Sequence, residues 1–238
     1  MASSFPLPIS AVCLLTCLVL HADVTVHTSK SFYDAAVLAT GATAEVVDFE
    51  SFGGNTLIAH LPQAVGGVTF ESFSTAGYDL IVEDEFGGTS GSNYLRITDD
   101  GGASTERFGF DDTLGLSFAQ PSNALGLYVI VNSTSFDFFA NDINITVNGS
   151  TYSNDGSESA TTVNGVAALF FGIVDESASF TTASISVGDI GTGLGDYDDI
   201  SFAIVPEPAH LGIAMGAVSL GLVIIHRRRN KTIPAEDT

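Results

Sequence analysis

The chain contains no tryptophan and few cysteines. Its only two cysteines, Cys13 and Cys17, lie within an apolar stretch near the N-terminus. The polar region that follows, residues 23–205, has none, which excludes disulfides, cysteine nucleophiles and thiolate metal sites there. Without tryptophan, exposed tyrosines are the remaining side chains for stacking on a sugar. The candidates are Tyr78, Tyr94, Tyr152 and Tyr197.

Positive charge is almost absent from the same region. It holds 25 acidic residues but only three basic ones, Lys30, Arg96 and Arg107, which gives a formal charge of −22. Such a surface repels nucleic acids and anionic lipids, so nucleic-acid binding is excluded. The carboxylates also repel one another across the folded domain unless salt or divalent cations screen them.

Motifs of common enzymes are lacking as well. There is no Gly-x-Ser-x-Gly elbow, no HExxH and no phosphate-binding glycine loop. Within residues 23–205 the only histidines, His27 and His60, are too few for a metal cluster or a catalytic triad. A glycosidase needs two carboxyl groups about 5–10 Å apart, one with a raised pKa, and the sequence shows neither property. We therefore expect a non-catalytic protein.

Residues 1–22 have the order of a secretory signal peptide. An apolar core, residues 9–20, is followed by His21 and the small residue Ala22, after which we predict cleavage. No lysine or arginine precedes the apolar core, so an uncleaved membrane anchor is the alternative.

The C-terminal segment joins a proline motif, an apolar run and a basic cluster. The motif is Val205, Pro206, Glu207 and Pro208. Residues 209–225 predict a transmembrane helix that would span roughly 25 Å of a bilayer core about 30 Å thick. The basic cluster is Arg227, Arg228, Arg229 and Lys231. By the positive-inside rule, residues 231–238 form a cytoplasmic tail, and everything before Pro206 lies across the membrane.

This ordered combination, residues 205–230, resembles the PEP-CTERM sorting signal of Gram-negative exported proteins. The resemblance implies recognition by an exosortase, a membrane transpeptidase, with cleavage near Pro206. The product would leave the membrane for the cell surface or an exopolysaccharide matrix. The chain departs from the usual pattern in its nine residues after Arg229. An ordinary single-pass anchor that is never cut is the alternative.

Residues 23–204 predict an all-β domain. One helix is expected at residues 31–38, capped by Ser29 or Ser31, with Phe32, Ala35 and Ala36 on its apolar face. Elsewhere β-branched and aromatic residues alternate with polar ones, and turn signals recur about every ten residues. The predicted strands are residues 24–28, 45–49, 67–73, 78–82, 93–97, 107–110, 113–118, 124–131, 135–139, 143–147, 168–174, 179–187 and 197–204. This pattern favours a jelly-roll-like β-sandwich ectodomain.

Short motifs in this region carry a second resemblance. Residues 46–50, 66–70, 170–173 and 197–202 look like the ectodomains that often accompany this sorting signal, which are β-sandwiches similar to carbohydrate-binding modules. The resemblance implies an alternative function, a calcium-dependent carbohydrate-binding module.

Acidic pairs near both ends of the domain are the candidate metal ligands. Calcium prefers six to eight oxygen ligands from carboxylates and loop carbonyls. In a jelly roll the first and last strands are often neighbours, which would place Asp48 and Glu50 beside Asp198 and Asp199. One hypothesis is a structural calcium ion that joins the two ends, with Asp199 the better ligand because adjacent strand residues face opposite ways. Solvated carboxylates without a metal are the alternative.

Overall fold

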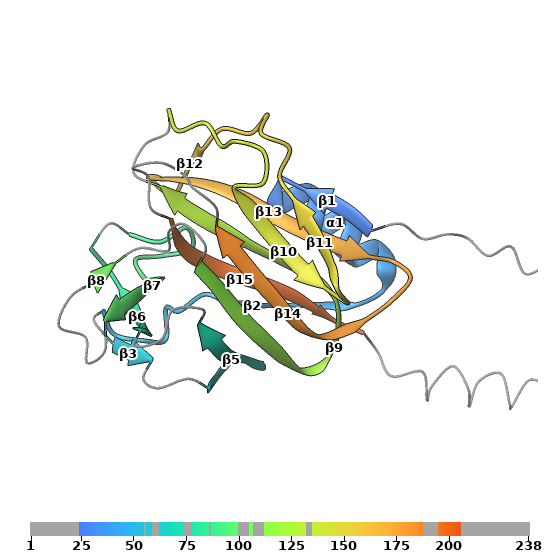
Figure 1. The fold of residues 1–238 in the computed structure, drawn as a ribbon, viewed down its shortest axis with the longest axis horizontal. Helices are drawn as coiled ribbons and strands as arrows, with labels where there is room; N and C mark the ends of the chain where they lie inside the picture. The colour runs from blue at the N-terminus through green and yellow to red at the C-terminus, as the bar shows by residue number, and fades with distance from the viewer. Residues whose placement is uncertain are drawn as a thin grey trace, which may run out of the picture.

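The computed structural model describes residues 24–54, 56–58, 62–73, 78–85, 87–99, 105–106, 112–131, 135–187 and 195–205. These residues form an antiparallel β-domain with a single α-helix among them (Figure 1). The prediction of an all-β domain is confirmed.

The described elements follow one another along the chain in a fixed order. They are β1 (Val24–His27), α1 (Lys30–Thr40), β2 (Thr43–Val47), β3 (Thr56–Ile58), β4 (Gln63–Val65), β5 (Val68–Phe73), β6 (Tyr78–Glu83), β7 (Tyr94–Asp99), β8 (Thr105–Glu106), β9 (Asp112–Val131), β10 (Ile143–Val147), β11 (Ser150–Ser153), β12 (Thr161–Val163), β13 (Val166–Asp175), β14 (Phe180–Val187) and β15 (Asp196–Ile204).

The longest strand, β9, connects two layers of one hydrogen-bonded sheet. Its first half pairs with β5 and β14, where Leu116 lies opposite Ala183. Its second half pairs with β13 and β15, where Leu127 lies opposite Phe171. Pro121, which has no N–H to donate, lies between the halves. The sequence predicted two separate strands here, and the chain instead runs through both layers without leaving the sheet (Figure 1).

The main hydrophobic core contains residues from both halves of β9. Alternate residues of the first half, Leu114, Leu116 and Phe118, are buried in it. So are alternate residues of the second half, from Leu125 to Val131. Because successive residues of a strand face opposite sides, the intervening residues of the second half point away from this core.

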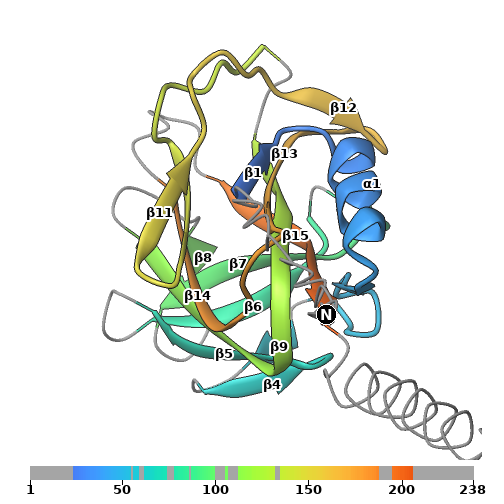
Figure 2. The ribbon, with the colours of Figure 1, turned by 90° about the vertical axis from the view of Figure 1, so that its right-hand side faces the viewer.

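Helix α1 covers the outer face of that second half (Figure 2). It begins after Ser29 and ends at Gly41, whose φ of 73° is the left-handed C-cap conformation that glycine adopts readily. Its buried residues are Tyr33 and Val37, whereas Phe32 is 71% exposed. Of the predicted apolar face, Phe32 and Ala35 are exposed and only Ala36 packs against the core. Burial follows the i, i+4 pair one position beyond Phe32 along the chain.

Two glycines make room for the helix. Gly126 of β9 and Gly172 of β13 lie opposite each other in register, and the Tyr33 ring lies against both. The Tyr33 hydroxyl donates a hydrogen bond to the Ser201 carbonyl of β15 at 3.1 Å. Strands β9, β13 and β15 are therefore joined under one helical side chain.

The predicted neighbourhood of the first and last strands is correct for β2 and β15, which pair with Val47 opposite Ile200. The predicted strand at residues 135–139 was wrong, since only Asp137 forms an isolated bridge, with Ser159. Pairing ends there because the chain turns after Phe139, where the Asp142 N–H donates to the Phe139 carbonyl at 3.2 Å.

Several predicted segments lie outside the described residues. They are the signal peptide with Ala22, the motif residues after Val205, the helix at 209–225 and the arginines at 227–229. No helix among the described residues is long and apolar enough to cross a membrane.

Candidate functional site

The loop between β6 and β7 lies against the beginning of β15. Glycines make this close approach possible, because a Cβ atom on Gly88 would overlap the Asn93 carbonyl and the Asp198 carboxylate. A Cβ atom on Gly91 would overlap the Glu50 carboxylate in the same way. The loop therefore sits directly on two of the four predicted metal ligands.

Asp198 accepts hydrogen bonds from this loop and from its own backbone. Its Oδ2 accepts from the Thr89 backbone N–H at 2.6 Å and lies 2.8 Å from the Thr89 hydroxyl. The Ser90 N–H adds a longer contact of 3.4 Å, and Oδ1 accepts from the Asp199 N–H at 2.8 Å. The side chain has no exposed surface. Asp198 therefore anchors the loop and is closed to a substrate.

Asp199 lies on the same side of the strand as Asp198, so the prediction that they face opposite ways was wrong. Asp199 has a φ of 49°, and the pairing of β15 with β9 is irregular between Asp198 and Ser201. This bulge interrupts the alternation of side chains. The Asp199 Oδ2 lies 2.9 Å from the Thr89 hydroxyl, and its buried Oδ1 has no hydrogen-bond partner among the described residues.

The two neighbouring carboxyl groups hold their protons more strongly than isolated ones. Burial, with a further contribution from the charge of Asp199, raises the pKa of Asp198 to about 7. Burial also raises the pKa of Asp199, and the nearby Asp48 adds to this effect. The hydroxyl groups of Ser90 and Thr89 and the charge of Lys30 act in the opposite direction on the Asp199 pKa, without cancelling it.

Asp48 and Glu50 flank this cluster from the segment after β2. Both side chains are exposed, and they have different interaction partners. Asp48 accepts from the Glu50 N–H at 3.2 Å, and its charge acts on Asp199. Glu50 accepts from the Asn93 N–H at 2.8 Å, and the Asn93 side chain donates to the Phe52 carbonyl at 2.8 Å. The structure thus brings Glu50, Asp198 and Asp199 to the β6–β7 loop, and Asp48 lies near enough to Asp199 for its charge to act there.

The predicted calcium ion does not fit this arrangement. The oxygens of Asp198 already accept from N–H and O–H groups, so within the pair only the Asp199 Oδ1 is without a partner among the described residues. Calcium requires six to eight oxygen ligands. Among the described residues no group of three or more His, Cys, Asp or Glu side chains is placed to hold a metal ion. The cluster is therefore an assembly that ties a loop to the sheet.

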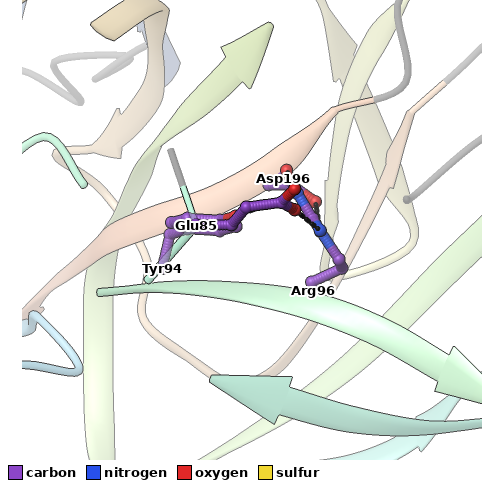
Figure 3. A network of polar contacts seen from close by, with 4 residues as sticks. All are labelled: Glu85, Tyr94, Arg96 and Asp196. Atoms are coloured by element: carbon purple, nitrogen blue, oxygen red, sulfur yellow. Dashed lines mark hydrogen bonds and ion pairs between the residues drawn. The ribbon is translucent and has the colours of Figure 1, made fainter. Parts of the chain in front are cut away.

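A buried ion pair lies on the neighbouring strands, and sequence reasoning missed it. The Arg96 guanidinium of β7 donates to both carboxylate oxygens of Asp196 of β15, each at 3.0 Å (Figure 3). It also donates to the Tyr94 hydroxyl at 2.9 Å and to Glu85 at 3.2 Å. Arg96 is 3% exposed and Asp196 1%. A lone arginine within a predicted strand was the available signal.

The geometry of the pair keeps Arg96 and Asp196 in their charged forms. Burial alone would lower the pKa of Arg96, but the hydrogen bonds and charge of Asp196 raise it instead. Two parallel N–H···O bonds to one carboxylate are the strongest arrangement available to an arginine. The pair therefore holds β7 against β15 beneath the loop that Asp198 anchors.

The predicted sugar-stacking tyrosines are only partly available. Tyr94 and Tyr197 are fully buried, so neither can stack on a ligand, and this prediction was wrong for both. Tyr152 on β11 is half-buried, and the side chain of Tyr78 lies outside the described part. A tyrosine that was not predicted, Tyr128 on β9, is half-buried and lines a groove beside the start of α1.

Comparison with known proteins adds no relative: no family model, no curated protein and no solved structure matches this chain.

Proposed function

We propose that this chain is an exported, non-catalytic protein of the cell surface or extracellular matrix, sorted by its C-terminal segment and associated with exopolysaccharide. The observation that carries the proposal is the order of features after the domain. The order is Pro206-Glu207-Pro208, then an uncharged apolar run, then Arg227, Arg228 and Arg229. An exosortase-type membrane transpeptidase is the partner that this order implies.

In this proposal, the chain has a jelly-roll-like β-sandwich between two segments that act in export. Residues 1–22 form the signal peptide, residues 23–204 the ectodomain, and residues 209–225 a transmembrane helix that holds the protein until it is processed. Prolines 206 and 208 favour extended backbone and donate no hydrogen bonds, so the peptide between domain and helix stays accessible to a transpeptidase.

The arrangement of the domain's two ends supports this proposal. Val24 at the start of β1 lies opposite Asp175 at the end of β13. Val205, the last described residue, donates its N–H to the Pro121 carbonyl at 3.0 Å and lines a hollow together with Asp175. Both segments that would enter the membrane therefore leave from one region of the domain surface.

The acidic surface fits the same location. A formal charge of −22 over residues 23–205 keeps the domain away from anionic headgroups and nucleic acids. A domain with this charge remains hydrated within a polymer matrix, where salt and divalent cations screen it.

The experiment is the intact mass of the protein recovered from its own cells. The proposal expects a species that begins near Asp23 and ends near Pro206. A species that still ends at Thr238 would show that the C-terminal helix is a permanent anchor, and sorting by cleavage would be rejected. A chain that retains residues 1–22 would reject the signal peptide separately.

A second candidate function, a carbohydrate-binding module, is favoured by one observation, the groove that Tyr128 lines. Its calcium dependence is not favoured, because the Asp198 carboxylate is already occupied by hydrogen-bond donors.

A further inference from the structure

A groove with a volume of about 640 Å³ runs beside the N-terminal end of α1. It is lined by residues of β9 and β13, of the segment that begins α1, and of the segment that leads into β12. This volume lies within the range of about 300–1,000 Å³ that is typical of small-ligand sites. The groove is therefore large enough to hold a small part of a polymer chain.

The floor of the groove is aromatic. Tyr128 is half-buried, and its ring packs edge-to-face on Phe170, with centroids 5.2 Å apart and planes at 71°. Phe170 also packs on Tyr33 at 5.1 Å, so the ring of Tyr128 rests on a fixed aromatic support. A rigid, partly exposed ring of this kind offers a flat apolar surface to a ligand at little cost in entropy.

The Tyr128 hydroxyl makes no hydrogen bond to the described residues, so its O–H group can donate to a ligand. Burial and the charges of Asp199, Asp34 and Asp198 raise the pKa of Tyr128, so the hydroxyl stays protonated at neutral pH. A ligand over the ring therefore meets one fixed donor beside an apolar face.

The walls of the groove are rich in hydroxyl groups. They carry Thr28, Ser29, Ser31, Ser157, Ser159 and Thr161. The one basic side chain, Lys30, is paired with Asp34 at 2.5 Å, and Glu158 is occupied by the Gly156 N–H at 2.9 Å. Lys30 is therefore paired within the protein, whereas Glu158 keeps its charge and accepts from backbone N–H groups. Among the wall hydroxyls, Ser29 and Ser31 bond to each other, and Ser159 donates to Asp137. A ligand thus meets an aromatic face bordered by hydroxyl oxygens that can still accept hydrogen bonds.

This combination selects the chemical class of the ligand. A pyranose ring has an apolar face that stacks on an aromatic side chain, and a rim of hydroxyls that exchange hydrogen bonds with serine and threonine. An anionic polymer is disfavoured because the surrounding domain carries a formal charge of −22. We propose that this groove binds a segment of a neutral polysaccharide, with Tyr128 as the stacking residue. The proposal rests on the matrix location argued above and names the ligand class within it.

The test is affinity electrophoresis of the full chain in detergent, through native gels that contain dextran, galactomannan or xylan. We expect retardation by at least one of these neutral polymers and none by the anionic polymer alginate. Retardation should persist in EDTA, because no calcium takes part. A native chain that none of the three neutral polymers retards overturns the proposal, and so does binding that EDTA abolishes.

Two substitutions locate the site. Tyr128→Ala removes the ring, and we expect about fivefold to tenfold weaker binding. Tyr128→Phe keeps the ring on Phe170 and removes only the hydroxyl, so this variant should fold normally and bind about threefold more weakly. The matched control is Tyr152→Phe, which changes another half-buried tyrosine outside the groove and should leave binding unchanged.

If Tyr128→Phe binds as tightly as the native chain, or if Tyr152→Phe weakens binding as much, the proposed site is wrong. These outcomes are separate from those of the sorting proposal, since the intact mass does not depend on whether the groove binds a polymer. A correctly processed chain that fails to bind would reject the groove alone.

Discussion

At the level of single residues, the Asp198 carboxyl makes the stability of the domain depend on pH. Its pKa is raised to about 7 in the folded chain, against an ordinary value of 3.8. Below pH 4 the group is protonated in both the folded and the unfolded chain, so its contribution is fully present. As the pH rises from about 4 to 7, only the unfolded chain releases the proton, and that stability is lost.

We therefore predict that the free energy of unfolding falls between about pH 4 and pH 7, and that Asp199→Asn makes this fall smaller. The asparagine Oδ1 keeps an acceptor for the Thr89 hydroxyl and removes the charge that raises the Asp198 pKa. Asparagine also tolerates the φ of 49° at this position. At pH 8 the variant should be more stable by on the order of 1 kcal/mol.

The measurement is urea unfolding at pH 4.5, 6 and 8, followed by circular dichroism. Asp155→Asn is the matched control, because it removes an exposed carboxylate that lies in the β11–β12 loop, far along the chain from the cluster. If Asp199→Asn and the native chain lose the same stability over this range, coupling between Asp199 and Asp198 is contradicted.

Arg96 and Asp196 illustrate the opposite way to bury charge. Here the two charges neutralise each other through two bonds of 3.0 Å, and Tyr94 and Glu85 occupy further donors of the guanidinium (Figure 3). Removal of one member of a buried pair leaves the other uncompensated, which is far more destabilising than removal of both. Asp198 and Asp199 avoid an uncompensated buried charge by retaining a proton. Arg96 and Asp196 avoid it because their opposite charges are paired.

For the cluster around Asp198, the sequence predicted the positions of some residues but not their role. The predicted proximity of Asp48 to Asp199 agrees with the structure, because β2 pairs with β15. The role of these residues was not predictable from acidic pairs alone. It is determined by the loop between β6 and β7 that contains Thr89 (the Thr89 loop). This loop is distant in the sequence and approaches Asp198 only because Gly88 lacks a side chain.

At the level of secondary structure elements, the docking of α1 depends on the glycine pair of β9 and β13. A Cβ atom on Gly172 would lie 2.9 Å from Tyr33 Cδ2 and 3.0 Å from Phe170 Cε1. Both rings are buried, so neither has space to move aside. A methyl group at this position would therefore force the helix away from the sheet.

We predict that Gly172→Ala destabilises the domain by about 1–3 kcal/mol, which is the usual effect of overpacking a core. Thermal unfolding followed by circular dichroism measures this change. Gly53→Ala is the control, because a Cβ atom there meets only the Thr56 hydroxyl at an ordinary 3.6 Å. Equal stability of Gly172→Ala and the native chain would show that the helix does not pack as described.

The same elements show where sequence patterns succeed. The strand at 143–147 was predicted with its observed bounds, because its residues alternate between buried and half-buried positions. The helix was predicted in place, but of its predicted apolar face only Ala36 packs against the core. Phe32 is the largest apolar residue in its segment, yet only Tyr33 meets the space left by Gly126 and Gly172, and that space comes from strands more than 90 positions away.

At the level of the whole molecule, charge opposes the compact state. The domain's 25 acidic residues face three basic ones, and two of these, Lys30 and Arg96, are already engaged in ion pairs. Most of the remaining carboxylates repel one another through solvent. The Debye length falls from about 10 Å at 0.1 M salt to about 3 Å at 1 M, so salt removes most of this repulsion.

We therefore predict that the unfolding temperature rises by about 3–6 °C between 0.05 M and 0.5 M NaCl, which corresponds to a gain of roughly 1–2 kcal/mol for a domain of this size. Calcium chloride and magnesium chloride at matched ionic strength separate screening from specific binding. Screening by the ion atmosphere requires nearly equal rises with both salts, because the two ions carry the same charge. A rise several degrees larger with calcium would reveal a specific calcium site and contradict the assignment of Asp198 and Asp199 as anchors of the Thr89 loop.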